Sequence, residues 1–273
     1  MKVLLTGASG FVGQHLLGDL LGRGADVRAV VRDSSHRPIK LSHQRLEIVE
    51  TSNLFEESSE GLKRLVSDCD VLVHAAWAVD PPEYLSSIAN VECLTGSLRL
   101  AEAFVACGGR RFVGIGTCFE YDLSSGPVTV DCNLRPATLY GACKASLYLT
   151  LDKLFEVTSR EFLWCRLFYL TGPGEHPQRL IPYLHRQLST GEPAHLGPGH
   201  AIRDYVDVRV AAAQIADLTM GAAVGPRNVS SGRPTTIRAL AEAVADVYGR
   251  RDLLFFASGD NGDSLPDVVA SAD

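Results

Sequence analysis

The sequence predicts an α/β fold, with a parallel, doubly wound sheet and a small substrate-binding lobe toward the C-terminus. Two observations lead to this prediction. Short apolar runs rich in β-forming residues alternate with segments of helical periodicity through residues 3–167. Glycine and proline then punctuate short elements over residues 171–199. Strands that alternate with helices imply right-handed crossovers and a parallel sheet, and the irregular region is where a second lobe would join it.

The predicted elements follow one another in a regular order. Strands are predicted at residues 3–5, 26–31, 46–49, 71–74, 112–115 and 162–167, with a short one at 227–229. Helices are predicted at residues 11–21, 98–106, 139–157, 207–220 and 237–248. The first helix ends at Gly22 and Gly24 and the second at Gly108, because glycine is a common C-terminal stop.

The composition excludes several classes of function. The 273-residue chain is 46% hydrophobic and 21% charged, as is usual for a globular protein. Its net charge is −6 without a long basic run, which argues against nucleic acid or an anionic membrane as partner. No apolar stretch has membrane-spanning length, and no signal peptide precedes the first strand. The seven cysteines form no C-x-x-C pair and the histidines lack ligand spacing, so we expect reduced thiols, no metal and a cytoplasmic location.

A glycine-rich turn follows the first strand and leads directly into a helix. Gly7, Gly10 and Gly13 are spaced three residues apart. The first would allow a tight turn, the second a close approach of backbone to a pyrophosphate, and the third close packing of helix on strand. The helix N-terminus offers free N–H groups and a positive dipole end to phosphates. The motif predicts a dinucleotide site, and an ordinary turn with adventitious glycines is the alternative.

A tyrosine and a lysine begin the long helix of residues 139–157. Tyr140 and Lys144 are four residues apart and therefore share one helical face. A free tyrosine titrates near pH 10, and a neighbouring ammonium favours its phenolate. The pair therefore indicates a general acid or base, although the same spacing also occurs on exposed helix faces.

The strand before this helix leads into Thr117, which precedes Tyr121 by four residues. Glycine turn, threonine and Tyr140–Lys144 pair in this order resemble the extended branch of the short-chain dehydrogenase/reductase superfamily, which holds sugar-nucleotide epimerases, dehydratases and ketoreductases. Further matches lie at residues 70–76, 166–168, 203–206, 228–229 and 231–233, so the resemblance spans residues 2 to about 245. It implies a Rossmann-type dinucleotide-binding domain (residues 1–167 plus about 204–230) and a substrate lobe (about 168–203 and 231–273).

The resemblance implies hydride chemistry on a sugar nucleotide. Tyr140 would protonate a ketone oxygen oriented by Thr117, while Lys144 would hold the nicotinamide ribose and keep the Tyr140 pKa low. Arg203 would contact the nucleotide diphosphate, and a salt bridge to Asp204 or Asp207 is its structural alternative. Weaker substrate candidates are Arg179, Tyr169 and Glu120, the last of which could instead be solvated. Residues expected to bind the coenzyme, besides Tyr140 and Lys144, are Gly7, Ser9, Gly10, Phe11, Val12, Gly13, Arg32, Asp33, Asn53, Leu54, Ala75, Ala76 and Phe168.

Two departures from the family pattern narrow the reaction. The family's 4,6-dehydratases carry Asp-Glu after the threonine, whereas this chain has Cys118 and Phe119, so dehydration is disfavoured. Tyr169 stands where 4-epimerases commonly carry asparagine, which weakens that assignment. We interpret Cys118, Cys143 and His74 as packing residues, because no partner base accompanies the cysteines.

The end of the second strand bears on the choice of coenzyme. Relatives that use NAD place an acidic residue there, and this chain has Arg32 followed by Asp33. Arginine favours NADP(H), and a register shift to Asp33 would restore NAD(H). We therefore expect an NADP(H)-dependent ketoreductase acting on a nucleotide-linked 4-keto-6-deoxyhexose in deoxysugar biosynthesis. The alternatives are an NAD-dependent sugar-nucleotide epimerase, a small-ketone reductase and a non-catalytic dinucleotide sensor.

Relatives commonly dimerise through the helix with the Tyr-Lys pair and the helix before strand 112–115. Apolar residues lie on more than one side of the predicted helix 139–157, which predicts a homodimer. These residues are Leu147, Leu149, Leu151, Leu154 and Phe155.

Overall fold

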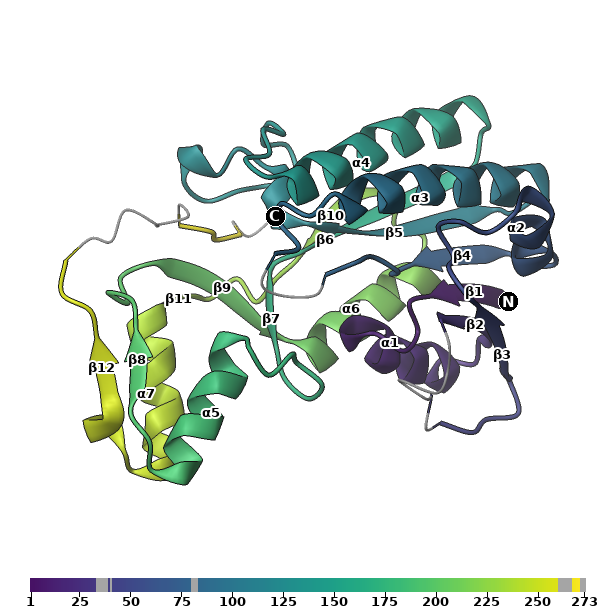
Figure 1. The fold of residues 1–273 in the computed structure, drawn as a ribbon. Helices are drawn as coiled ribbons and strands as arrows, with labels where there is room; N and C mark the ends of the chain where they lie inside the picture. Colours follow the sequence, from purple (N-terminus) through teal and green to yellow (C-terminus); the bar gives the residue numbers. More distant parts are fainter. Residues whose placement is uncertain (33–38, 40, 80–82, 260–266, 271–273) are drawn as a thin grey trace.

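The computed structural model describes residues 1–32, 39, 41–79, 83–259 and 267–270. A seven-stranded sheet forms its centre, with the order β10-β6-β5-β4-β1-β2-β3 and parallel pairing throughout (Figure 1). The strands are β1 (Lys2–Thr6), β2 (Asp26–Arg32), β3 (Leu46–Thr51), β4 (Val71–His74), β5 (Arg111–Thr117), β6 (Glu161–Leu167) and β10 (Gly225–Val229). All predicted strands are present, which confirms the α/β fold class. The strand order reverses between β1 and β4, and sheets of this kind bind ligands at that reversal.

Helices cover both faces of the sheet (Figure 1). In β1, Leu4 packs into the core beneath α2, α3 and α4, whereas Val3 and Leu5 pack into the core beneath α1 and α6. Successive residues of a strand point to opposite faces, so a strand covered on both faces needs an unbroken apolar run. The covering helices are α1 (Phe11–Gly22), α2 (Ser59–Val66), α3 (Ala89–Ala106), α4 (Leu139–Val157) and α6 (Val208–Met220).

Two helices differ from the sequence prediction. α3 begins nine residues earlier than predicted, because its first half packs through small and polar side chains that carry no apolar periodicity. At Gly96, for example, a Cβ would lie 2.5 Å from the Cα of Phe55. α2 is absent from the predicted elements and begins after Ser58, whose hydroxyl accepts a hydrogen bond from the Gly61 N–H at 3.0 Å. Such a cap stabilises a helix start by about 1 kcal/mol.

The apolar residues of α4 divide between the core and the surface. Leu147, Leu151 and Phe155 are fully buried against the sheet, because a spacing of four residues puts them on one helical face. Leu154 is partly buried, and Leu149 is 55% exposed. Apolar side chains thus lie on more than one side of α4, and the three core residues belong to the side that packs on the sheet.

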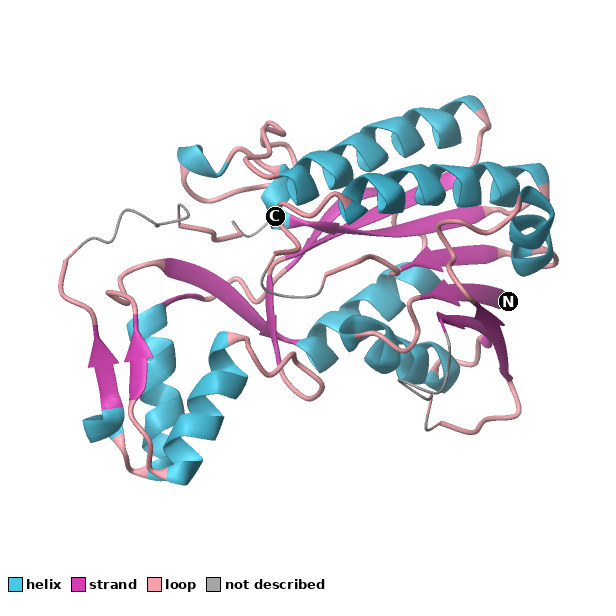
Figure 2. Cartoon of the chain, in the orientation of Figure 1, coloured by secondary structure: helices cyan, strands magenta, loops and turns pink. Residues whose placement is uncertain are grey.

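Smaller sheets follow β6 and lie beside the main one (Figure 2). β7 (Tyr169–Thr171), β9 (Ile202–Asp207) and β11 (Pro234–Thr236) form a three-stranded sheet, and β8 (Ala194–Leu196) pairs with β12 (Leu254–Phe256). α5 (Leu180–Thr190) and α7 (Ile237–Tyr248) pack beside β8 and β12 around Leu184, Leu188 and Ala241. α5 also is absent from the predicted elements. Three short 3-10 turns complete the described chain: η1 (Cys118–Glu120), η2 (Leu123–Ser125) and η3 (Arg251–Leu253).

Candidate active site

The glycine turn after β1 meets the segment after β4 at the point where the strand order reverses. Gly7 has φ +70°, and a Cβ there would lie 2.7 Å from the backbone nitrogen of Ala76 and 2.8 Å from the carbonyl carbon of Ala75. A Cβ on Gly13 would collide with the carbonyl oxygen of Gly7. Both positions therefore exclude a side chain. The N–H of Gly10 closes the turn on the Gly7 carbonyl at 2.9 Å, and α1 begins at the next residue.

The other predicted coenzyme residues lie along the same edge, at the carboxyl ends of the strands. Leu54 and Phe168 present little surface, since they are 8% and 5% exposed. Arg32 is exposed at the end of β2, and Asp33 lies outside the described residues. Ser9, Phe11 and Val12 surround the start of α1, Asn53 follows β3, and Ala75 and Ala76 follow β4.

A buried histidine connects this loop to α3. His74 Nδ1 lies 2.8 Å from the hydroxyl of Thr6, and its Nε2 lies 2.7 Å from the hydroxyl of Ser97. The Thr6 hydroxyl also accepts the Ala76 N–H at 3.3 Å. Burial lowers the pKa of His74 to about 3, and the nearby Lys144 contributes to this shift. His74 is therefore a neutral residue that orders the loop, as its interpretation as a packing residue requires.

Thr117 and Tyr140 come together where β5 ends and α4 begins. The Thr138 hydroxyl accepts the Gly141 N–H at 3.1 Å, and the Leu85 carbonyl accepts the Tyr140 N–H at 3.0 Å, so the first turn of α4 is capped twice. The Thr117 side chain lies close enough to the Tyr140 phenol to oppose the rise in the pKa of Tyr140. Thr117 and Tyr140, two of the predicted residues, thus lie together. They are near the turn of residues 7–13, which we call the coenzyme loop because it is predicted to bind the coenzyme.

The third predicted residue does not act on Tyr140 as expected. The Lys144 Nζ donates to the Ile115 carbonyl at 2.7 Å and lies 3.7 Å from the centroid of the Trp77 ring. Burial raises the pKa of Tyr140, the nearby Tyr84 adds to this, and the Thr117 side chain opposes it. The prediction that Lys144 keeps the Tyr140 pKa low is wrong for the protein without coenzyme, because the phenol is shielded from water.

Glu120 is a structural residue and cannot meet a substrate. It is fully buried, so both the predicted sugar contact and the solvated alternative are wrong. Its carboxylate accepts hydrogen bonds from Arg166 Nε at 2.7 Å, from Trp164 Nε1 at 3.1 Å and from the Thr117 backbone N–H at 2.8 Å. Burial raises the pKa of Glu120, and the Arg166 guanidinium opposes that shift. These contacts fix the backbone of Thr117 from beneath.

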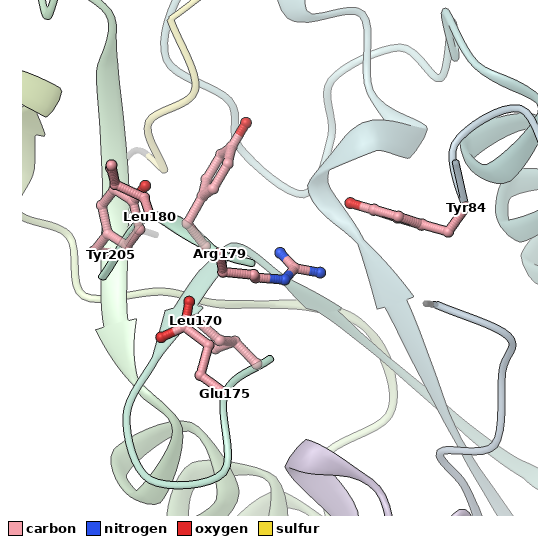
Figure 3. Close-up of a pocket in the computed structure, with 7 residues that line it drawn as sticks. Tyr84, Leu170, Glu175, Arg179, Leu180 and Tyr205 are labelled. Carbon is pink, nitrogen blue, oxygen red and sulfur yellow. The ribbon is translucent and has the colours of Figure 1, made fainter. Parts of the chain in front are cut away.

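A pocket of about 230 Å³ lies between Tyr84 on one side and Leu170, Arg179 and Tyr205 on the other (Figure 3). The ring of Tyr84, at its rim, lies edge-on to the Tyr140 ring with centroids 5.1 Å apart. Arg179 extends across the pocket toward Tyr84, its guanidinium carbon 5.6 Å from that ring. The Tyr169 hydroxyl is buried with no hydrogen-bond partner among the described residues. The pocket is lined by Tyr84, Tyr169, Leu170, Glu175, Arg179, Leu180 and Tyr205.

Sequence reasoning identifies two of these lining residues, Tyr169 and Arg179. Tyr205 lies in a segment already matched to the family, at residues 203–206, and that match could have flagged it. Tyr84 and Glu175 come from loops far apart in the chain, and nothing in their local sequence marks them.

Arg203 lies on β9 behind the pocket. It is 6% exposed, donates to its neighbour's carbonyl at Ile202 and lies 4.0 Å from the carboxylate of Asp267. Its guanidinium carbon is 5.4 Å from the Tyr169 ring centroid. The two acidic residues suggested as its alternative partners have other contacts. Asp204 accepts hydrogen bonds from the backbone and hydroxyl of Ser231, and Asp207 pairs with Arg209.

The thiols around the site are protonated and buried. Burial raises the pKa of Cys118 to about 12 and also raises that of Cys143. Neither therefore has the thiolate character of a nucleophile. Among the residues that the structure describes, no group of three His, Cys, Asp or Glu could hold a metal ion, and no helix is long and apolar enough to cross a membrane.

Comparison with known proteins gives sequence relatives along most of the chain. A dTDP-6-deoxy-L-talose 4-dehydrogenase (NAD(+)) of Aggregatibacter actinomycetemcomitans is 26% identical over 249 residues, covering 89% of this chain and 88% of the relative. A dTDP-4-dehydro-6-deoxy-D-allose reductase of Streptomyces bikiniensis is 26% identical over 270 residues, covering 91% and 81%.

Structure and family models agree with these relatives. The UDP-N-acetylglucosamine 4-epimerase from Methanobrevibacter ruminantium M1 superposes with a TM-score of 0.87 over 99% of this chain and 89% of that protein, at 23% identity, which shows a shared fold. The model of the NAD dependent epimerase/dehydratase family matches residues 3–230. The chain belongs to the NAD dependent epimerase/dehydratase family, and with it to the extended short-chain dehydrogenases/reductases.

Proposed function

We propose that this chain uses NADPH to reduce the keto group of a nucleotide-linked 4-keto-6-deoxyhexose. The observation that carries the proposal is the Tyr140 phenol, which has the Thr117 side chain beside it and lies next to the tyrosine-lined pocket through its edge-on contact with Tyr84. A substrate carbonyl placed next to Tyr140 would have the hydroxyl groups of Tyr140 and Thr117 on the same side. The named activities of the two sequence relatives, on dTDP-linked 6-deoxyhexoses, support the substrate class.

The Tyr140 phenol is protonated at neutral pH, as a proton donor has to be, because burial raises its pKa. A phenol that stays protonated at neutral pH can give its proton to an oxygen that becomes negative as the carbonyl is reduced. Thr117 would orient that oxygen, and Lys144 would hold the coenzyme's ribose hydroxyls. The coenzyme, when bound, supplies the hydride. The start of α1 fits its pyrophosphate, because no side chain caps the first N–H groups of the helix and Gly10 precedes them without a side chain.

The residues next to Thr117 support reduction over dehydration. Phe119 carries no acid or base, and its ring lies 6.4 Å from that of Tyr140 and 6.0 Å from that of Tyr169. Cys118 is buried and protonated. Elimination of water needs an acid and a base at these positions, whereas reduction needs only the phenol and the coenzyme.

Three arginines around the site favour NADPH and a diphosphate as ligands. Arg32 is exposed at the end of β2, where a guanidinium can pair with a 2′-phosphate. Arg179 and Arg203 contact the rings of Tyr84 and Tyr169 from two sides, and would bind the substrate's diphosphate. We assign residues 1–167 and about 204–230 to coenzyme binding, and about 168–203 and 231–273 to substrate binding.

The proposed assembly is a homodimer through α3 and α4. Leu149 on α4 is 55% exposed and Val91 on α3 is 42% exposed, which leaves apolar surface on both helices. Light scattering with Leu149→Glu tests this. We expect a dimer mass for the wild type and a monomer mass for the variant, and a monomeric wild type contradicts the assembly.

The experiment that tests the function follows NADPH and NADH absorbance with a panel of 4-keto-6-deoxyhexose nucleotides. Consumption of NADPH with at least one of them, at tenfold or greater preference over NADH, is the expected result. Tightly bound NAD with turnover that needs no added coenzyme would establish the epimerase alternative. Coenzyme binding without turnover on the whole panel would favour the sensor, and turnover restricted to ketones without a nucleotide would favour the small-ketone reductase.

A further inference from the structure

The Lys144 ammonium lies on the face of an indole ring. Its Nζ is 3.7 Å from the centroid of the Trp77 ring and 2.7 Å from the carbonyl oxygen of Ile115. Lys144 is 3% exposed, so this ring and this carbonyl stand where water would be. The ring quadrupole attracts a cation, and the attraction is largest when both groups are desolvated.

Hydrogen bonds hold this ring in its orientation. Trp77 Nε1 donates to the side-chain oxygen of Asn90 at 2.8 Å. The Asn90 amide nitrogen in turn donates to the carbonyls of Tyr84 at 2.6 Å and Ser87 at 2.9 Å. Asn90 is fully buried, and all three contacts match the donor and acceptor ends of its amide. The indole therefore cannot turn away from Lys144 without leaving buried polar groups unpaired.

Trp77 also stands between the coenzyme loop and the reacting groups. It directly follows Ala75 and Ala76, which contact Gly7, and its ring lies edge-on to the Tyr140 ring with centroids 6.4 Å apart. One side chain thus touches the cation and the phenol, and its backbone continues the loop that receives the coenzyme.

The charges around Lys144 give it little other support. Burial lowers its pKa to about 7, and two groups oppose that shift: Glu120 from the turn after β5 and Cys93 from α3. Glu120 is already paired with Arg166 at 2.7 Å, and the burial of Cys93 keeps its thiol protonated. His74, on β4, is neutral. Among the described residues, the ammonium is therefore supported mainly by the Ile115 carbonyl, which accepts its hydrogen bond, and by the indole face of Trp77.

We propose that Trp77 is a positioning residue, whose ring, fixed by Asn90, holds the Lys144 side chain as a cation beside the coenzyme loop. This inference rests on the proposed function only in that Lys144 is the residue that binds the coenzyme's ribose.

Nuclear magnetic resonance of ¹³Cε-labelled lysine tests the role of the ring without coenzyme or substrate. The sequence has only five lysines, so Lys144→Met assigns the relevant signal. Trp77→Leu removes the π face, whereas Trp77→Phe keeps a π face and loses the hydrogen bond to Asn90. We expect the Lys144 titration midpoint to fall by about one pH unit in Trp77→Leu and by less than half of that in Trp77→Phe, which corresponds to about 1.4 kcal/mol for the larger shift.

Two results would overturn the proposal. An unchanged midpoint in Trp77→Leu would show that the ring does not stabilise the cation. An equal fall in both variants would show that the Asn90 contact, and not the ring, is responsible. Trp77→Met also removes the ring, and its flexible unbranched side chain adapts better to the space left, so it replaces Trp77→Leu should that variant fail to fold.

Binding of NADPH, followed by its fluorescence from pH 6 to 9, gives the second measurement. Affinity that needs the ammonium is present below the midpoint and lost as pH rises through it, so the decline starts about one unit lower in Trp77→Leu. At pH 8 this is about a tenfold weaker Kd. A shifted midpoint without turnover of any 4-keto-sugar nucleotide would disprove the proposed function and leave the role of Trp77 standing. Turnover of a 4-keto-sugar nucleotide with an unshifted Lys144 midpoint in Trp77→Leu would support the proposed function and disprove the role of Trp77.

Discussion

The Glu120 carboxylate accepts the backbone N–H of Thr117 at 2.8 Å and binds the Arg166 guanidinium at 2.7 Å. Thr117 in turn meets Tyr140, so a fully buried ion pair supports the hydroxyl that faces the site. The ion pair is closed by Trp164 and Tyr121, which bind its two ends. Stability and site geometry are therefore coupled at this point.

Glu120→Gln is expected to lower the free energy of unfolding by about 3–5 kcal/mol, because it leaves the buried Arg166 charge unpaired. Urea unfolding measures the change. Glu60→Gln, at an exposed pair with Lys63, is the control and should leave the midpoint unchanged. The double variant Glu120→Gln/Arg166→Met should recover at least half of the loss, and no recovery would show that the cost comes from the Thr117 contact instead.

Tyr140→Phe is expected to reduce kcat for the keto sugar by a factor of about 10²–10⁴, because the proton donor is removed. The Kd for NADPH should change much less than kcat, since Tyr140 is one of many residues expected to bind the coenzyme. Stopped-flow kinetics and a fluorescence titration measure the two quantities. A variant that keeps the wild-type kcat would show that another group protonates the substrate.

Acid should destabilise the protein through His74. Its pKa is about 3 in the folded state and near 6.5 when unfolded, so the unfolded state takes up the proton first as pH falls. Its contribution to the free energy of unfolding is complete above pH 6.5 and falls by about 1.4 kcal/mol for each unit below it, down to about pH 3. Urea unfolding at pH 6.5 and 4.5 should show a shallower dependence in His74→Gln. His195→Gln, at an exposed histidine, should keep the wild-type dependence.

Local sequence patterns predict the strands and helices, and those functional residues that lie within one element. The apolar run of β1, the glycine spacing and the Tyr140–Lys144 pair each lie within a few residues, so the sequence is enough to place them. Glu120 illustrates what is not local. Its partner Arg166 is 46 residues away and belongs to another strand, and a charged residue in a turn is indistinguishable by sequence from a solvated one.

The same limit applies to the electrostatics of Tyr140 and to the pocket. The pKa of Tyr140 is raised by its burial next to Tyr84, which lies in a loop 56 residues earlier in the chain. The Lys144 ammonium contacts the Trp77 ring and the Ile115 carbonyl. The helical spacing of Tyr140 and Lys144 shows that they share a face, and the tertiary contacts decide what each one meets.

Arg32→Glu is expected to reverse the coenzyme preference. Replacing the exposed guanidinium with a carboxylate repels a 2′-phosphate and accepts ribose hydroxyls, so kcat/KM for NADPH should fall at least tenfold and that for NADH should rise. Arg32→Lys keeps the positive charge but loses the two-pronged guanidinium, so its ratio of kcat/KM for NADPH to that for NADH should lie between those of the wild type and Arg32→Glu. Initial rates with both coenzymes provide the test, and an unchanged ratio would rule out Arg32 as the selecting residue.

Tyr169→Phe should move stability and function in opposite directions. The Tyr169 hydroxyl is buried without a partner among the described residues, and leaving a polar group in that state costs about 1–3 kcal/mol. Removing it should therefore raise the free energy of unfolding by about 1 kcal/mol. Tyr169 also lines the pocket with Arg179 and Glu175 and is a proposed substrate-binding residue, so the KM of the sugar nucleotide should rise about tenfold, as expected when a hydrogen bond to a charged group is lost. Tyr205→Phe, at the neighbouring ring, is the matched control for the change in stability and should leave unfolding unaltered. A destabilised Tyr169→Phe variant with an unchanged KM would mean that the hydroxyl supports the fold. Higher stability together with a higher KM would mean that the hydroxyl is unpaired in the free protein because it binds the substrate.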